Sequence, residues 1–286
     1  MEILAWSRLF NALQIRHKVL HGQVFREYQK MMIPLGPASE SFVLNKKEIK
    51  EIKKLSSTGM VRLQQPSESL ETGWWAIVCR QYKGVDAIRS DKARNQIRKA
   101  IASTSVKKVT ADFILKNGMP VFLASEAARG KVSVKKTQEW IKQLQVYQEF
   151  PKLVHFWAVF AGEKMCAYCE VYVYDKEEAN YSVIKFDPAF KANYPVYALI
   201  HTMTDFYLNQ QKISMVNAGY RSLLHDTNFQ DFLISKFGFE KYYLHMQLKL
   251  GLLMAIGIRL LSFNLFTNLL PAKLKALVKM TRISYR

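Results

Sequence analysis

The stretch from Ile213 to Lys241 constrains the fold of this chain more than any other, because a strand, a capped helix and a second strand follow one another there. Residues Ile213 to Ala218 are β-branched and apolar, a pattern that predicts a short buried strand. Thr227 or Asn228 can then cap a helix, since short polar side chains accept its free first-turn N–H groups. Apolar residues recur along one face of that helix: Phe229, Phe232, Leu233, Ile234 and Phe237.

A glycine ends this predicted helix. Gly238 stands where a left-handed residue is favoured, directly after Phe237. The aromatic run Phe239–Leu244 follows at once and predicts the second strand.

The region before this block carries the clearest β-strand signal. Lys152–Ala161 turns at Gly162 and Glu163 into Met165–Tyr174, and a third strand, YSVIKF, ends at Asp187. Strands joined by such short turns predict an antiparallel meander. We expect a central mixed sheet, built from this meander and the Ile213 strand and flanked by helices. One of these helices is predicted over Pro195–Leu208, with proline in its first turn.

The order of these elements resembles that of the GNAT acyltransferase superfamily. In its C-terminal half an Asn-started helix ends in a Gly-Phe pair, as Asn228 and Gly238 suggest here. The segment SDKARNQIRKA, Ser90–Ala100, resembles the Arg-rich helix of Fem-type peptidyltransferases and related GNAT-like acyltransferases. The resemblance covers roughly Trp74 to Leu250. It implies an α+β fold with a mixed α/β sheet, of the GNAT-like acyl-CoA N-acyltransferase type.

The remaining residues are expected to extend this domain at both ends. We predict an N-terminal helical extension over residues 1–66, the GNAT-like domain over residues 67–250 and a basic amphipathic tail over residues 251–286. The first boundary lies in the polar run QQPSESLETG around Pro66. Apolar residues at helical spacing near the start of the chain, and in KKEIKEIKKL, support the helical extension.

Net charge indicates an anionic partner. The chain carries 42 Lys and Arg against 23 Asp and Glu, a formal net charge of +19. Such a field suits nucleic acid, a phosphate-bearing cofactor or an anionic membrane surface. The alternative is a basic surface that serves only solubility.

The placement of cysteines and serines argues against a disulfide framework, a metal site and a hydrolase triad. Cys79, Cys166 and Cys169 do not suggest a disulfide framework. Cys166 and Cys169 form a C-x-x-C, but residues three apart on a strand point to opposite faces, so we predict no metal site. No Gly-x-Ser-x-Gly elbow is present, so a hydrolase triad finds no support.

Two departures from the GNAT pattern bear on the donor. Acyl-CoA-using members usually hold the pyrophosphate with a Gly-rich loop, whereas DPAFKANYPVYAL contains no glycine. Lys191 is the point charge that replaces it in our interpretation. Ile234 stands where many members place a tyrosine that protonates the leaving thiolate. We therefore predict no resident cofactor, with acyl-CoA as one alternative co-substrate. Fem-type enzymes use aminoacyl-tRNA instead.

Candidate site residues follow from their places along these elements. Asp187 and Glu170 are the predicted catalytic carboxylates, able to accept a proton from an amine; a turn-capping aspartate before proline is the alternative for Asp187. The predicted donor-binding residues are Lys191, Arg94, Arg98, Asn217, Tyr220, Arg221 and Asn228. An ordinary solvated basic helix or a turn role is the alternative for most of them. We interpret His201, His225 and His245 as structural or exposed.

The last part of the chain has a composition of its own. No Asp or Glu occurs from Lys241 to Arg286. Leu250–Leu270 is apolar, but Arg259 makes spanning a bilayer costly. The Lys-rich stretch after Pro271 is typical of an interfacial helix. We predict monotopic membrane association, with packing on the main domain as the alternative.

These observations favour a GNAT-like N-acyltransferase or aminoacyltransferase at the cytoplasmic face of a membrane. It would move an acyl group from an anionic carrier (acyl-CoA, acyl carrier protein or aminoacyl-tRNA) to an amine. The rival hypothesis is a catalytically degenerate GNAT-like domain that binds an anionic lipid, carrier protein or RNA. The missing glycines predict tighter binding of the larger carriers than of free coenzyme A.

Overall fold

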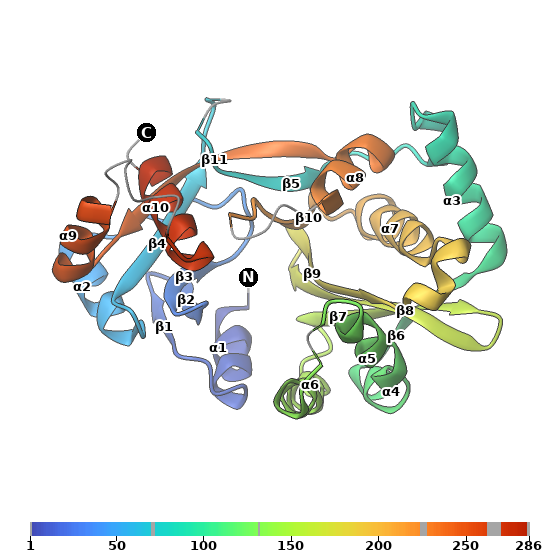
Figure 1. Cartoon of the computed structure of the whole chain (residues 1–286), viewed down its shortest axis with the longest axis horizontal. Coiled ribbons are helices and arrows are strands. Elements are labelled where there is room, and N and C mark those ends of the chain that lie inside the picture. Colours follow the sequence, from blue (N-terminus) through green and yellow to red (C-terminus); the bar gives the residue numbers. More distant parts are fainter. Residues whose placement is uncertain (1, 70–71, 131, 224–227, 262–269, 285–286) are drawn as a thin grey trace. The chain divides into compact units, whose positions relative to one another are not determined.

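Two compact units make up the structure, a computed structural model that describes residues 2–69, 72–130, 132–223, 228–261 and 270–284 (Figure 1). Unit 1 holds Met1–Ala76, Tyr220–Asn228 and Lys241–Arg286, and unit 2 holds Ile77–Gly219 and Phe229–Glu240. The chain passes from unit 1 into unit 2 within strand β5, Trp75–Cys79. This division differs from the predicted domains, because the first and last parts of the sequence fold into one unit.

The predicted meander is confirmed in unit 2. Its strands lie in the order β10-β9-β8-β7-β6. Strand β8 pairs antiparallel with both β7 and β9, while β10 pairs parallel with β9. The strands are β6 (Ser105–Val109), β7 (Val154–Ala161), β8 (Lys164–Tyr174), β9 (Glu178–Phe186) and β10 (Met215–Tyr220). The Ile213 strand thus joins the meander in one mixed sheet, as predicted.

Helices cover both faces of this sheet (Figure 1). Helix α7 lies on one face, where the Tyr181 hydroxyl is 3.1 Å from the Thr204 hydroxyl. Helices α4, α5 and α6 lie on the other, where the Trp140 indole donates to the Tyr168 hydroxyl. The helices of unit 2 are α3 (Asp91–Ser103), α4 (Ala111–Asn117), α5 (Met119–Ala127), α6 (Val134–Tyr147), α7 (Pro195–Asp205) and α8 (Asn228–Phe237). Short 3₁₀ helices η1 (Val85–Ala87) and η2 (Pro188–Asn193) and the π-helical turn η3 (Phe206–Gln210) complete it.

Unit 1 corrects the prediction of a helical extension over residues 1–66. Its strands lie in the order β1-β2-β3-β4-β11. They are β1 (His17–Leu20), β2 (Gln23–Tyr28), β3 (Met31–Leu35), β4 (Met60–Pro66) and β11 (Glu240–Lys249). The helices are α1 (Ile3–Ala12), α2 (Lys46–Leu55), α9 (Leu252–Leu261) and α10 (Ala272–Ser284). The apolar spacing near the start therefore described α1 alone.

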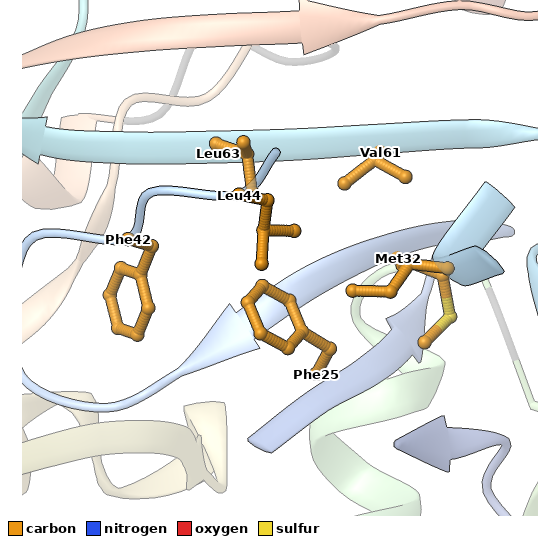
Figure 2. Close-up of a cluster of buried hydrophobic side chains, with 7 residues drawn as sticks. Phe25, Met32, Phe42, Leu44, Val61 and Leu63 are labelled. Atoms are coloured by element: carbon orange, nitrogen blue, oxygen red, sulfur yellow. The ribbon is translucent and has the colours of Figure 1, made fainter. Parts of the chain in front are cut away.

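One face of the unit 1 sheet carries a closed hydrophobic cluster (Figure 2). Phe25, Met32, Val61 and Leu63 contribute from β2, β3 and β4, and Ile52 contributes from α2. Helix α2 forms because Asn45 makes a capping box with Glu48, in which each side chain accepts a backbone N–H of the other residue. Its apolar stripe is then buried on the sheet.

The opposite face of this sheet is where the C-terminal segment packs. Leu277 and Met280 of α10 and Met254 of α9 contact a buried cluster formed by Met31, Ile33 and Met60. The Ser284 hydroxyl accepts the Leu248 N–H at 2.8 Å. Packing on the body of the protein, the alternative to a separate tail, therefore holds for α10.

Helix α9 leaves apolar side chains in solvent. Leu252 is 77% and Ile256 is 51% exposed, whereas Ile258 is buried. Residues 262–269, part of the predicted Leu250–Leu270 segment, lie outside the described residues. Among the helices that are described, none has the length and apolar character needed to cross a membrane.

Candidate functional site

Strands β9 and β10 run together for only a short distance. Their parallel register pairs Glu178 with Met215, Ala179 with Val216 and Asn180 with Asn217. Beyond this ladder β9 continues to Phe186, and no described residue of β10 pairs with it there. One edge of β9 therefore leaves backbone N–H and C=O groups that a bound chain can use.

A β-bulge lies just past the point where the two strands part. Glu170 pairs with Val183 and Val171 pairs with Tyr181, so Ser182 has no partner on β8. Ser182 is also exposed. A bulge bends a strand and turns its backbone groups, and bulges are common next to active sites.

The ladder ends at a buried polar cluster. The Asn217 amide donates to the Glu178 carboxylate at 3.0 Å, and its oxygen accepts the Gly219 N–H at 2.8 Å. Asn180 also donates to Glu178, and both Glu178 and Asn217 are fully buried. Asn217 is therefore buried at the last paired position, where β9 and β10 separate.

The other end of β9 leads directly to a helix N-terminus. The Asp187 carboxylate accepts the Ala189 N–H at 2.9 Å and so caps η2. Lys191 in η2 is exposed. Tyr194 has a positive φ of 51°, an uncommon conformation for a tyrosine, and directs the chain into α7 at Pro195. Asp187 and Lys191 thus lie together at the carboxyl end of β9.

The two predicted arginines of α3 have partners within unit 2. Arg94 donates to the Ile88 carbonyl at 2.5 Å and forms an ion pair with Asp91. Arg98 donates to Asp86 at 2.7 Å. The basic residue of α3 that lies beside η2 and α7 is Lys99, whose ammonium stands 5.5 Å from the centre of the Tyr194 ring.

Glu170 lies on the sheet face that α6 covers. It accepts the Tyr147 hydroxyl at 3.2 Å, and that hydroxyl is 2.7 Å from the Tyr172 hydroxyl. Burial, followed by the charge of Glu170, raises the pKa of Tyr147 well above its ordinary value. The Glu170 side chain is only 5% exposed, and its catalytic role stays a prediction.

A second buried carboxylate, which the sequence did not single out, binds β9 from the same side. Glu126 of α5 accepts from Lys185 of β9 at 2.5 Å and from Lys136 of α6 at 3.2 Å. The side chains of Glu126 and Lys185 are 8% and 12% exposed. Burial raises the pKa of Glu126, but the two lysines lower it by more, so the carboxylate stays ionised.

The other predicted binding residues belong to unit 1. The Tyr220 hydroxyl accepts from Gln64 at 2.7 Å, and the ring stacks on Trp74. Arg221 donates to the Gly73 carbonyl at 2.5 Å, and its guanidinium lies 4.3 Å from the centre of the Trp75 ring. Asn228 is exposed as the first residue of α8, while Thr227 and His225 lie outside the described residues.

The structure therefore brings only part of the predicted set together. Asp187 and Lys191 lie at one end of β9, Asn217 at its closed end and Glu170 on the neighbouring strand. The sequence reading missed Ser182, Lys99 and Lys185. Lys185 carried a usable signal, since a lysine inside an otherwise apolar strand needs a partner; the position of the bulge carried none.

His201 and the three cysteines all lie within unit 2. His201 bonds to the Tyr82 hydroxyl at 2.8 Å, and burial lowers its pKa. Cys79, Cys166 and Cys169 are free and buried, and burial raises the pKa of each thiol. Among the described residues no three His, Cys, Asp or Glu side chains gather as a metal site.

Comparison with known proteins identifies the fold. No protein-family model and no curated protein sequence matches the chain. Among solved structures, FemX matches with a TM-score of 0.55 and 9% identity, over 84% of this chain and 88% of that one. The C-terminal domain of a protein named as a lysylphosphatidylglycerol synthetase from Agrobacterium fabrum matches with a TM-score of 0.52 and 11% identity, over 89% and 90% of the two chains.

A third structure extends the comparison. A conserved protein of unknown function from Bacteroides thetaiotaomicron matches with a TM-score of 0.51 and 13% identity, over 85% of this chain and 88% of that one. At such identities the likeness concerns the fold alone. The chain has a GNAT-like mixed α/β fold, as the Ile213–Lys241 block and the meander predicted.

Proposed function

We propose that this protein is a GNAT-like N-acyltransferase or aminoacyltransferase that moves an acyl group from an anionic carrier to an amine. The observation that carries the proposal is the separation of β9 from β10 after Asn180 and Asn217. It leaves a free strand edge, followed by a bulge at Ser182 and the N-terminus of α7. The lysylphosphatidylglycerol synthetase domain, named for a product that joins an aminoacyl group to a lipid, shares the fold and supports the same class.

The free edge of β9 is suited to an extended donor arm. Main-chain groups of Tyr181–Phe186 can bond to amide groups of such an arm, as in strand addition. A backbone N–H at the Ser182 bulge can then donate to the oxygen of the donor carbonyl. This interaction strengthens as negative charge develops on that oxygen during attack by the amine.

Positive charge beside α7 supports an anionic carrier. Lys99 and Lys191 are exposed, and both lie on elements that adjoin the start of α7. The Ser103 hydroxyl donates to the Asn193 carbonyl at 3.4 Å, which holds α3 against η2. Because η2 contains no glycine, its side chains keep a pyrophosphate away from the backbone, so we favour acyl carrier protein or aminoacyl-tRNA over free acyl-CoA.

Asp187 remains the proposed general base. One of its oxygens accepts the Ala189 N–H, and the carboxylate stands at the carboxyl end of β9 next to η2. During transfer the amine forms a bond to the acyl carbon and loses its proton to Asp187, while the carrier leaves with the electrons of its bond to the acyl group. Glu170 supports the bulge from the buried side and holds its position through Tyr147.

A cytoplasmic membrane face is the proposed site of action. Exposed apolar residues of α9 stand beside a C-terminal segment free of acidic residues. Anionic lipid attracts each nearby Lys or Arg by about 1 kcal/mol, and exposed leucine and isoleucine can enter the interface.

Transfer assays with the full chain test the proposal. Acetyl-CoA, an acylated acyl carrier protein and lysyl-tRNA are the donors, with free lysine and phosphatidylethanolamine vesicles as amine acceptors. We expect turnover with a macromolecular donor. Asp187→Asn should lower turnover about 100-fold and spare donor binding, because asparagine still caps η2 but cannot take a proton.

The rival function predicts another outcome. A degenerate domain would bind one of these carriers saturably and transfer nothing from any of them. Turnover that is unchanged in Asp187→Asn would instead remove Asp187 from the mechanism and leave the class of enzyme standing.

A further inference from the structure

Strand β4 carries an arginine whose charge is buried without a carboxylate. Arg62 is 8% exposed, and its Nε is among the buried atoms that have no hydrogen-bond partner. No described Asp or Glu lies within ion-pair distance of it. A buried charge is costly unless it is paired and hydrogen-bonded, so such an arginine calls for an explanation.

Aromatic rings supply part of the compensation. The Arg62 guanidinium carbon lies 5.0 Å from the centre of the Trp74 ring and 5.8 Å from that of Tyr220. These two rings are nearly parallel, with their centres 6.2 Å apart. Ring faces attract a cation, but they accept none of the five N–H bonds that a guanidinium can donate.

A second arginine lies on the same face of the unit 1 sheet. Arg26 of β2 pairs with Ile33 of β3, which shares a cluster with Met60, and Met60 and Arg62 point to the same side of β4. The Arg26 guanidinium lies 5.2 Å from the centre of the Tyr28 ring, and its Nε is also buried without a partner. Burial lowers the pKa of Arg62; Tyr220 and Tyr28 raise it, and the positive charge of Arg26 lowers it.

Gln64 adds a neutral polar group to this cluster. It lies two residues from Arg62, on the same side of β4, and its Nε2 donates to the Tyr220 hydroxyl at 2.7 Å. Its Oε1 is buried without a partner. Rotating the amide by 180° lets Oε1 accept from the Tyr220 hydroxyl and turns the amide N–H donors to the side where Oε1 stood.

We propose that Arg62, Arg26 and Gln64 form a binding site for a phosphate group, carried by a small phosphorylated molecule or by a phospholipid headgroup. Two guanidinium groups match the charge of a phosphate, and the planar fork of Arg62 suits two of its oxygens. Trp74 and Tyr220 hold this fork in place. The site lies within unit 1 and is independent of the transfer chemistry assigned to β9 in unit 2.

Phosphate titration of the full chain is the first test, by calorimetry with inorganic phosphate and glycerol 3-phosphate. Arg62→Gln is expected to weaken binding at least tenfold. Arg8→Gln, an exposed arginine on α1 of the same unit, is the matched control and should bind as the wild type does. This control measures how much of the binding comes from the general attraction of a basic chain for anions.

Conservative variants keep the test informative if Arg62→Gln does not fold. Arg62→Lys retains the charge but loses the fork, and should weaken binding at least threefold; Arg26→Gln should weaken it as well. No saturable phosphate binding by the wild type overturns the proposal. Equal binding by wild type, Arg62→Lys and Arg62→Gln overturns it too, and leaves Arg62 as a residue held only by its aromatic neighbours.

Vesicle flotation distinguishes the two sources of the phosphate. Phosphatidylglycerol vesicles that retain the wild type but lose Arg62→Gln, with Arg8→Gln retained, assign the site to a lipid headgroup. Equal retention of all three proteins, together with the tenfold loss of glycerol 3-phosphate binding, assigns it to a small molecule. Neither readout depends on acyl transfer, so the site and the proposed function fail separately.

Discussion

The two units treat buried charge in different ways. In unit 2 the buried Glu126 has two lysines, and the arginines of α3 each have an oxygen partner. In unit 1 Arg62 is buried among aromatic rings, and no described carboxylate lies within ion-pair distance of it. The net charge of +19 therefore does not locate an anion site by itself. The informative cations are those that the chain leaves without a partner.

The sharpest test of this comparison removes the paired carboxylate. Glu126→Gln leaves Lys185 buried without a counter-charge, and we expect the free energy of unfolding to fall by about 3 to 4 kcal/mol. Urea unfolding at neutral pH measures this. Glu139→Gln is the control, because Glu139 is exposed and its Oε1 lies 4.0 Å from the Lys135 Nζ. A loss no larger than that of the control would mean that the pair contributes nothing.

Unit 2 also contains a partly buried histidine, His155, that is held in its neutral form. Burial, with the charge of Lys108, lowers the pKa of His155 from its ordinary value of 6.5 to about 4. The unfolded chain takes up this proton first as the pH falls, so the stability that neutral His155 provides is present above pH 6.5 and is lost toward pH 4. We expect a loss of about 2 kcal/mol over that range, somewhat below the full linkage value because His155 is partly exposed.

Replacing the ring isolates this contribution. His155→Gln should remove most of the pH dependence of the free energy of unfolding between pH 6.5 and pH 4. Unfolding curves collected across this range decide it. An unaltered slope in His155→Gln would show that other groups govern the acid limb.

Replacing Arg62 should change the free energy of unfolding in the opposite direction to replacing Glu126. Arg62→Met removes an unpaired buried charge and retains apolar bulk, so without ligand we expect unfolding free energy to stay level or rise by about 1 kcal/mol. Loss of the ring contacts limits the gain. The measurement is urea unfolding in phosphate-free buffer. A loss of about 2 kcal/mol or more would show that the aromatic contacts alone compensate Arg62, which would remove the contrast between the units.

Sequence patterns predicted the fold of unit 2 better than that of unit 1. The meander, α7 and the Ile213 strand have regular apolar spacing and Gly or Pro at their ends, so their bounds were nearly correct. In unit 1 two hairpins turn at His21–Gly22 and at Gln29–Lys30, and His21, Gln29 and Lys30 all have positive φ. Residues of these types seldom adopt this conformation, so neither turn could be predicted from their residue types.

The candidate sites were less predictable still, for a physical reason. Glu126 and Lys185 come from different elements and meet only because α5 packs on β9. The burial of Arg62 depends on Trp74 and on Tyr220, which is distant in sequence. Asp187 and Lys191 could be named as candidates because a strand end and a helix start are local features. Pairing between distant segments has no local signature.

Substituting the exposed apolar residues of α9 should cause the smallest change in the free energy of unfolding. Leu252→Ser with Ile256→Ser should leave the free energy of unfolding nearly unchanged, because both side chains are already in solvent. Deleting the whole segment from Leu250 would be a poorer test, since α10 covers Met31, Ile33 and Met60 and its loss would expose that cluster. The double substitution separates membrane contact from packing.

Membrane binding should respond although stability does not. Burying two such side chains in an interface contributes about 1 to 2 kcal/mol beyond their present exposure, so partitioning onto phosphatidylglycerol vesicles should fall roughly tenfold. Leu274→Ser is a useful further variant, because Leu274 is exposed among the lysines of α10. If the Leu252 and Ile256 variant floats as well as the wild type, and loses its binding only at raised salt, the lysines alone attach the protein. If neither protein binds vesicles, α9 is not a membrane contact. A tenfold loss together with unchanged unfolding assigns Leu252 and Ile256 to a membrane contact at the surface of unit 1.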